Sequence, residues 1–222
     1  MAGLIGNTDA SGQVGGKVAA LLAARGHRQR LIVPDAAAAP GLPGAEISVL
    51  ADESDSQAMR AALAGVDTVF LVPVRERPDR VSVHCGAVDA AVAAGAGRIV
   101  YLSFLSAAPD ATFTWARDHY ATEEYIRAAG VSFTFLRGSV FLEVLQYAVG
   151  PDQTIRSPGG DGRFAPWRAM TWPGSWRQCW SRPGRTPARP MRSRGRPRFR
   201  SGSWRRRSRR RAGAGQLCGS GR

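Results

Sequence analysis

A glycine-rich segment near the amino terminus, "TDASGQVGG" at residues 8–16, is the clearest candidate for chemistry in the 222-residue chain. It follows a short apolar run and precedes an alanine-rich one, which predicts a turn between a first strand and a first helix. Free backbone N–H groups at such a turn, with the helix dipole behind them, bind pyrophosphate. We expect Ser11, Gly12, Gln13 and Val14 to form this cradle, and Gly15 to allow the helix close to the sheet. The alternative is a tight turn that holds no ligand.

The second candidate is the segment "RDHYATEEYIR", in which His119 and Glu123 are four residues apart. On a helix this spacing places both on one face, where they could hold a ribose or polarise an acceptor carbonyl. The alternative is a histidine on the helix surface, paired with a glutamate. Lys17 is the only lysine, so the Tyr-x-x-x-Lys pair of the usual short-chain dehydrogenases is absent. His27 and His84 have no companions at metal-ligand spacing, and we expect no metal site.

The elements that would position these residues alternate regularly. Short apolar runs without polar alternation, typical of parallel strands buried on both faces, are separated by helical runs that each end at a glycine. This order predicts an α/β, doubly wound parallel sheet of the Rossmann type, with ligands beyond the carboxyl ends of the strands. The expected strands are 3–8, 30–33, 46–50, 68–74, 98–104 and 132–136, and the expected helices are 14–25, 56–64, 80–94 and 115–129, closed by Gly26, Gly65, Gly95 and Gly130.

Charge divides the chain into two parts. Residues 1–161 carry 13 basic and 17 acidic side chains, whereas residues 162–222 carry 18 arginines and no acidic residue. We therefore expect a nucleotide-binding domain over residues 1–162 and an Arg/Trp/Pro/Gly-rich, disordered tail over residues 163–222. Cys85, Cys179 and Cys218 are unevenly spaced, which argues against a disulfide framework. No run is long and apolar enough for a membrane helix, so we expect a cytoplasmic protein.

Four segments together resemble one family. They are "TDASGQVGG", "LAGVDTVFLV", the run from 93 to 141, and "GPDQTIRSPGGDGR" at 150–163. These are similar to the NmrA-like, quinone-oxidoreductase-type branch of the atypical short-chain dehydrogenases. The resemblance implies an NAD- or NADP-binding Rossmann domain followed by a small lobe that closes the substrate cleft. It also implies hydride transfer to a small acceptor such as a quinone, although some relatives serve as redox sensors.

Carried onto this chain, the resemblance places the cofactor along the carboxyl ends of the strands. Asp9 departs from the family pattern, because a glycine is usual there and a carboxylate would repel pyrophosphate. Pro34 stands where relatives often have an arginine for the 2′-phosphate of NADP, and Asp35 could accept a bond from a free 2′-OH, which favours NAD. The expected cofactor-binding residues are Thr8, Ala10, Ser11, Gly12, Gln13, Val14, Gly15, Asp35, Asp52, Leu71, Pro73, Ser103 and His119, with His119 also the candidate catalytic residue.

The tail has three interpretations. It is an arm that binds nucleic acid through arginines and tryptophans, a solvated charge run, or an out-of-frame reading of the family's lobe. Read one base earlier, the codons of "WRAMTW" at 167–172 permit V-A-R-D-D-V, which is how relatives continue after "GDGR". We favour the frameshift, with only non-specific nucleic-acid binding by the tail. Loss of the lobe would impair catalysis and uncover Phe135, Val140, Phe141 and Leu145.

Overall fold

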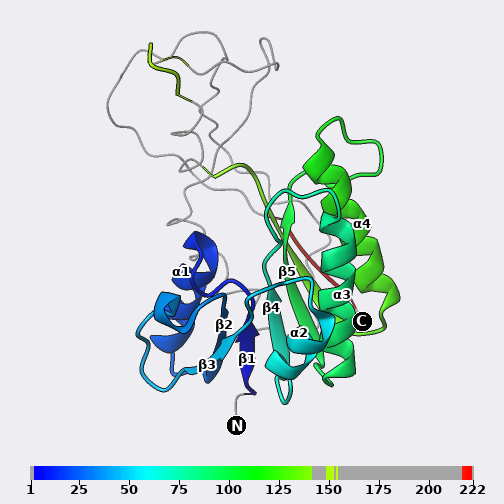
Figure 1. The fold of residues 1–222 in the computed structure, drawn as a ribbon. Helices are drawn as coiled ribbons and strands as arrows, with labels where there is room; N and C mark the ends of the chain where they lie inside the picture. The colour runs from blue at the N-terminus through cyan, green and yellow to red at the C-terminus, as the bar shows by residue number, and fades with distance from the viewer. Residues whose placement is uncertain (1–2, 142–148, 153, 155–216, 222) are drawn as a thin grey trace.

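The computed structural model describes residues 3–141, 149–152, 154 and 217–221. The amino-terminal part is an alternation of strands and helices around one sheet (Figure 1). The elements are β1 (Ile5–Asn7), α1 (Gln13–Ala23), β2 (Gln29–Val33), the 3-10 helix η1 (Ala36–Ala38), β3 (Glu46–Val49), α2 (Ser56–Ala62), β4 (Thr68–Leu71), α3 (Arg80–Ala93), β5 (Arg98–Phe104), α4 (Thr114–Ala128), β6 (Ser132–Gly138) and β7 (Leu217–Gly221).

The sheet has the order β3-β2-β1-β4-β5-β6-β7, and the first six of these strands are parallel. Chain order reverses between β1 and β4, because β2 and β3 lie on one side of β1 and the later strands lie on the other. This 3-2-1-4-5-6 order is the doubly wound arrangement that binds dinucleotides at the reversal point. The predicted fold class is confirmed.

Helices cover both faces of the sheet, as Figure 1 shows, with α1 on one face and α2, α3 and α4 on the other. The larger core lies under α2–α4 and includes Leu63, Ile99, Tyr101 and Ile126, all fully buried. The smaller one packs α1 residues such as Val18 against alternate residues of the central strands. The strands are therefore buried on both sides, which explains their unbroken apolar runs.

The four α-helices end next to the glycines that were expected to close them. The backbone of each capping glycine is left-handed, a conformation that side chains with a Cβ rarely adopt. The φ angles are 72° at Gly26, 73° at Gly65, 84° at Gly95 and 71° at Gly130. Strand β5 has the predicted bounds, and the other elements differ from the expected ranges by one to three residues.

Two features differ from expectation. Residues Leu217–Gly221, inside the tail expected to be disordered, form β7 and pair antiparallel with β6. Strand pairing uses backbone groups alone and needs no apolar pattern, so the tail composition did not indicate it. Phe135 is 2% exposed in the core under α2–α4, so its expected exposure is wrong. Leu145, and the tail apart from Leu217–Gly221, lie outside the described residues.

The described residues form no helix that is long and apolar enough to cross a membrane. Nor does the described part of the chain bring three or more His, Cys, Asp or Glu side chains together as a metal site would require.

Candidate functional site

The loop from β1 to α1 lies at the reversal point of the sheet, and hydrogen bonds hold its backbone on both sides. The Thr8 amide donates to the carbonyl of Phe70 in β4 (3.1 Å), and the Ala10 amide donates to that of Ile32 in β2 (3.3 Å). The Thr8 hydroxyl also accepts from the Val72 amide at 3.0 Å. Thr8 and Ala10, both predicted cofactor residues, are buried, and they shape the loop rather than present side chains to a ligand.

Asn7, at the end of β1, joins this loop to the helix. Its side-chain nitrogen donates to the Gly15 carbonyl at 2.9 Å, and its oxygen accepts from the Asp9 amide at 3.3 Å. A Cβ on Gly15 would lie 1.8 Å from the Asp9 carbonyl oxygen. Only glycine fits there, which confirms the predicted close approach. Asn7 escaped the sequence analysis, although a polar residue at the end of a buried strand was a usable signal.

The first turn of α1 leaves backbone donors open. Gly12 is the N-cap residue and makes no side-chain cap. The amides of Ser11, Gln13 and Val14 find no acceptor among the described residues. Unpaired amides at a helix N-terminus, with the positive end of the helix dipole, form an anion site. The backbone of this loop therefore fits a pyrophosphate.

Asp9 lies in this same space. A Cβ on Gly12 would meet the Asp9 carboxyl group, with Oδ2 at 1.9 Å and Cγ at 2.3 Å. Burial raises the pKa of Asp9 from 3.8 to about 6, while Arg75 and a bond from the Gly12 backbone act in the opposite direction. Burial also raises the pKa of Glu53, and the charge of Asp9 adds to this rise. Glu53 and Arg75 therefore belong to the surroundings of the loop, although neither was predicted.

The two predicted carboxylates after β2 and β3 are exposed. Asp35 caps η1 by accepting from the Ala37 amide at 3.0 Å. Asp52 accepts from the amide and the hydroxyl of Ser54 at 2.9 and 2.7 Å, and these bonds lower its pKa. Both lie just beyond the carboxyl ends of their strands, on the side of the sheet where the α1 loop lies.

Three predicted residues lie on β4 and β5 or in the loop after β4. Leu71 is 3% exposed and packs in the core under α2–α4, so its side chain is turned away from a ligand. Pro73 is partly buried in the loop after β4. Ser103 is buried, and its hydroxyl donates to Glu123 at 2.5 Å.

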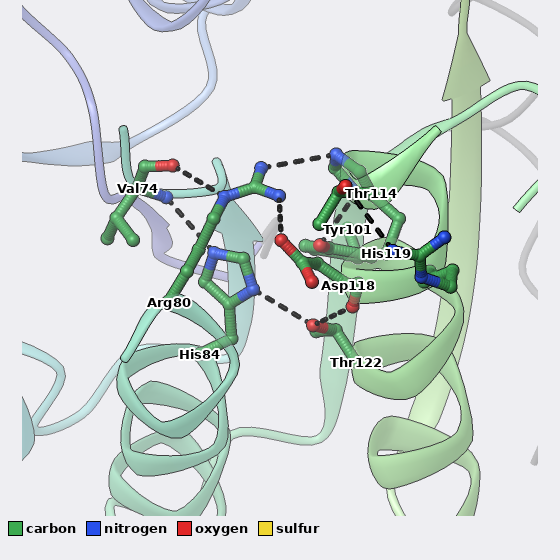
Figure 2. A network of polar contacts seen from close by, with 9 residues as sticks. Val74, Arg80, His84, Tyr101, Thr114, Asp118, His119 and Thr122 are labelled. Atoms are coloured by element: carbon green, nitrogen blue, oxygen red, sulfur yellow. Dashed lines mark hydrogen bonds and ion pairs between the residues drawn. The ribbon is translucent and has the colours of Figure 1, made fainter. Parts of the chain in front are cut away.

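His119 is held inside a polar network between α3 and α4 (Figure 2). It is 4% exposed, so the interpretation as a surface histidine is wrong. Its Nδ1 lies 2.8 Å from the Tyr101 hydroxyl and its Nε2 lies 3.2 Å from the Arg80 guanidinium. Because a guanidinium only donates, Nε2 accepts and the proton of the neutral ring is on Nδ1, directed at Tyr101. Burial and the nearby charge of Arg80 hold the pKa of His119 well below its usual value.

Arg80, at the start of α3, is the centre of this network. It is 4% exposed and donates from Nε to the Val74 carbonyl at 3.1 Å. The guanidinium also pairs with Asp118 at 3.3 Å and lies 5.5 Å from the centre of the Trp115 ring. A buried arginine is retained only when its donors have partners, and here the partners come from α4 and the loop after β4.

His84, one turn after Arg80, extends the network along the two helices (Figure 2). Its Nε2 accepts from the Val74 amide at 3.2 Å, so its proton is on Nδ1, 2.9 Å from the Thr122 hydroxyl. Thr122 in turn donates to the Asp118 carbonyl at 2.9 Å. Burial, with the charge of Arg80, lowers the pKa of His84 to about 3. The spacing of Arg80 from His84, and of Asp118 from Thr122, is a helical i, i+4 pattern that could have indicated this pairing of helices.

Glu123 has other partners than the predicted one. It is fully buried, and its carboxylate binds Ser103, Arg137 of β6 (2.5 Å) and Arg127 (3.1 Å). The predicted joint action of His119 and Glu123 is therefore not supported, because the helix turns the two side chains to different neighbours. The hydrogen bonds that Arg137 donates to Glu123 also raise the pKa of Arg137.

Comparison with known proteins connects this geometry to a family. A family model described as NAD(P)H-binding matches residues 10–154, which include the α1 loop from Ala10 onward and both helices of the polar network. The chain belongs to the NAD(P)H-binding family.

Curated members of the NAD(P)H-binding family are similar in sequence. A quinone oxidoreductase of Escherichia coli is 32% identical over 170 residues, covering 73% of this chain and 58% of that protein. An NAD(P)H azoreductase of Xenophilus azovorans is 30% identical over 151 residues, covering 67% and 51%. The chain thus spans about half the length of the curated relatives it matches.

Solved structures agree with the family assignment. The NADPH complex of an E. coli quinone oxidoreductase superimposes with a TM-score of 0.64 at 27% identity, over 76% of this chain and 61% of that one. The NADP(H) complex of a Citrobacter triphenylmethane reductase gives a TM-score of 0.66 at 23% identity, over 78% and 62%, and this likeness concerns the fold. The cofactor class of the NAD(P)H-binding domain is thereby confirmed as NAD or NADP.

Proposed function

We propose that this chain is the cofactor domain of an NAD(P)H-dependent oxidoreductase that reduces a small acceptor of the quinone type. The observation that carries the proposal is the α1 loop, with three open amides at a helix N-terminus and a Gly15 position that tolerates no Cβ. Relatives named as a quinone oxidoreductase and an azoreductase support the acceptor class. The bound nicotinamide supplies the hydride, so the protein needs mainly to bind and orient the two rings.

Residues of the chain have distinct parts in this function. The amides of Ser11, Gln13 and Val14 hold the pyrophosphate, and Asp35 lies where it accepts a bond from an adenosine ribose. The network of Arg80, Tyr101 and His119 acts as a positioning device, because it fixes the start of α4 beneath Phe104, whose ring stacks on His119 at 5.9 Å. His119 holds its proton on Nδ1 for Tyr101 and is therefore a positioning residue in this arrangement, not the acid that protonates an acceptor.

The test of the proposal is a pair of glycine variants. In Gly15→Ala the new Cβ would lie 1.8 Å from the Asp9 carbonyl oxygen, whereas in Gly16→Ala the closest contact is the Ala10 carbonyl oxygen at 3.1 Å. We expect Gly15→Ala to abolish quenching of protein fluorescence by NADH and Gly16→Ala to retain most of it. Oxidation of NADH by 1,4-benzoquinone should follow the same order. Equal binding by both variants would contradict the loop assignment.

Asp35 supports a preference for NAD over NADP. Its exposed carboxylate follows β2 and would repel a 2′-phosphate. We expect Asp35→Asn to tighten NADPH binding by about tenfold, which corresponds to about 1.4 kcal/mol, and to change NADH binding little. Titration of both cofactors against both proteins measures this, and an NADPH preference in the unaltered chain would overturn it.

A second function, that of a redox sensor that binds the dinucleotide without turnover, is favoured by the engagement of both His119 nitrogens with protein groups. Binding of NADH without oxidation by any quinone would identify it.

We also propose that residues 163–222 are an out-of-frame reading of the family's lobe, that catalysis is impaired by its loss, and that the protein is cytoplasmic. Sequencing the gene across the codons of Asp161 to Met170 tests the frame, and restoring V-A-R-D-D-V should restore turnover.

A further inference from the structure

The carboxylate of Asp9 lies at the anion site of α1, and the backbone on either side holds it there. The amides of Thr8, Asp9 and Ala10 all donate to β1, β2 or β4. The side chain cannot leave by a shift of the loop without breaking these bonds. A ligand at the open amides must therefore meet the Asp9 carboxyl group.

The position of Gly12 shows how close the Asp9 carboxyl group lies to the site of an anionic ligand. The nearest atoms to an ideal Gly12 Cβ are all from the Asp9 carboxyl group, Oδ2 at 1.9 Å and Cγ and Oδ1 at 2.3 Å. Gly12 is the N-cap of α1, so the carboxylate lies beside the first turn, where an external anion gains most from the helix dipole. A second negative charge within about 4 Å is repelled, and the repulsion grows as water is excluded.

We propose that Asp9 controls dinucleotide affinity by placing a carboxylate beside the pyrophosphate position, so that the cofactor binds the form of the protein in which Asp9 is neutral. This inference rests on the proposed function of the α1 loop and adds a regulated residue to it. Binding of the pyrophosphate is then coupled to uptake of one proton, and affinity falls as the solution becomes more alkaline.

The polar groups around Asp9 come from three segments. Glu53, from the loop after β3, and Arg75, from the loop after β4, are the charged groups that interact with Asp9, whereas Asp52 and Arg77 act on Glu53. Asn7 contributes only a neutral amide from β1. Of these groups, Arg75 opposes proton uptake by Asp9, but burial outweighs it and leaves the pKa of Asp9 near 6. The change in affinity is therefore expected between about pH 5 and 8.

The experiment is a calorimetric titration with ADP-ribose at pH 6 and pH 8. ADP-ribose carries the pyrophosphate without the acid-labile dihydronicotinamide, and it lacks the 2′-phosphate of NADP, whose own second pKa is near 6. If only neutral Asp9 is competent, the dissociation constant of the unaltered protein rises by roughly 50-fold between pH 6 and pH 8.

Two variants distinguish a specific effect of Asp9 on binding from a general effect of the charge of the protein. Asp9→Asn keeps the shape of the side chain and should bind at both pH values at least as tightly as the unaltered protein at pH 6. Asp110→Asn removes an equal charge from an exposed position and should keep the full pH dependence. Circular dichroism at both pH values, with the Asp9→Gly variant as a second replacement, verifies that the variants are folded.

The outcomes are distinguishable. Tight, pH-independent binding by Asp9→Asn together with pH-dependent binding by the unaltered protein supports the inference. Equal, pH-independent binding by both overturns it and leaves the cofactor function intact. Absence of ADP-ribose binding by every folded variant at both pH values overturns the assignment of the α1 loop itself.

Discussion

Two carboxylates, Asp9 and Glu123, are buried in different electrostatic environments. Glu123, on α4, is fully buried and bonded to one hydroxyl and two arginines. Asp9, in the α1 loop, is largely buried beside open amides, and among the described residues the opposite charge acting on it is the guanidinium of Arg75. Burial raises the pKa of Asp9 to about 6, whereas Glu123 has direct ionic partners.

The difference shows what each region does. A buried carboxylate paired with two arginines stabilises the fold, because removal of one partner leaves a buried charge without compensation. A carboxylate that is largely buried without a bonded cation is energetically costly at neutral pH, and groups with pKa values shifted in this way concentrate where ligands bind. The comparison therefore assigns Glu123 to stability and Asp9 to binding.

The largest effect is expected from Glu123→Ala. The variant leaves Arg137 and Arg127 beside a cavity without their buried partner, and we expect the free energy of unfolding to fall by about 3–5 kcal/mol. The matched control is Glu124→Ala, whose exposed pair with Arg127 should cost about 0–1 kcal/mol. Urea unfolding at pH 7 measures both. Equal losses would remove the distinction between the two regions.

The opposite sign is expected at Asp9. The folded pKa is raised above the unfolded value, so the ionised carboxylate destabilises the fold at pH values above about 6, and the penalty disappears as the pH falls below 3.8. Asp9→Asn should stabilise the protein at pH 8 by at most about 3 kcal/mol and have little effect at pH 4. Urea unfolding of this variant and of Asp110→Asn at both pH values measures the gain. A loss of stability at pH 8 would break the comparison.

A smaller effect of opposite pH dependence is expected from the buried histidines. The pKa of His84 is lowered to about 3, so the unfolded chain takes up a proton below about pH 6.5 and the folded chain does not. In an Asp9→Asn background, we expect His84 to lower the free energy of unfolding by about 2 kcal/mol between pH 6.5 and pH 5. Adding His84→Gln should remove this slope. An imidazole NMR signal of His84 that titrates above pH 5 would contradict its neutral state.

The smallest effect is expected at an exposed carboxylate, Asp89. Tyr125 donates to both of its oxygens at 2.8 and 2.9 Å, which raises the pKa of Tyr125. Because water can replace this bond, Tyr125→Phe should change the free energy of unfolding by less than about 1 kcal/mol. Thermal unfolding measures it, and a loss comparable to that of Glu123→Ala would show that exposure is not what separates these carboxylates.

Local signals predicted most of the fold. Apolar runs, helical spacing and the four capping glycines depend on neighbours in the chain, and β5 and the caps lie where these signals put them. The Gly15 requirement was predicted for the same reason. Strand β7 was not predicted, because its pairing with β6 joins residues that are far apart in the sequence. Such pairing uses backbone groups, which every residue has, so no pattern of side chains indicates it.

The candidate site was predicted only in part. The open amides of Ser11, Gln13 and Val14 lie at the helix N-terminus where they were expected, because their position follows from the strand-turn-helix order. The partners of His119 and Glu123 were predicted wrongly, because i, i+4 spacing defines a helix face but not the groups opposite it. Tyr101 and Arg80 come to His119 from other elements, and Arg137 comes to Glu123 from the neighbouring strand.

By itself, the sequence determined the order of elements, the doubly wound class and the place of the phosphate loop, because each depends on contacts within a few residues. Only the tertiary structure decided that Asp9 lies against Gly12, that Glu123 binds arginines and that both buried histidines are neutral. These properties depend on which charges burial brings together. Burial is set by the packing of the whole sheet and its helices, and no local pattern in the chain encodes it.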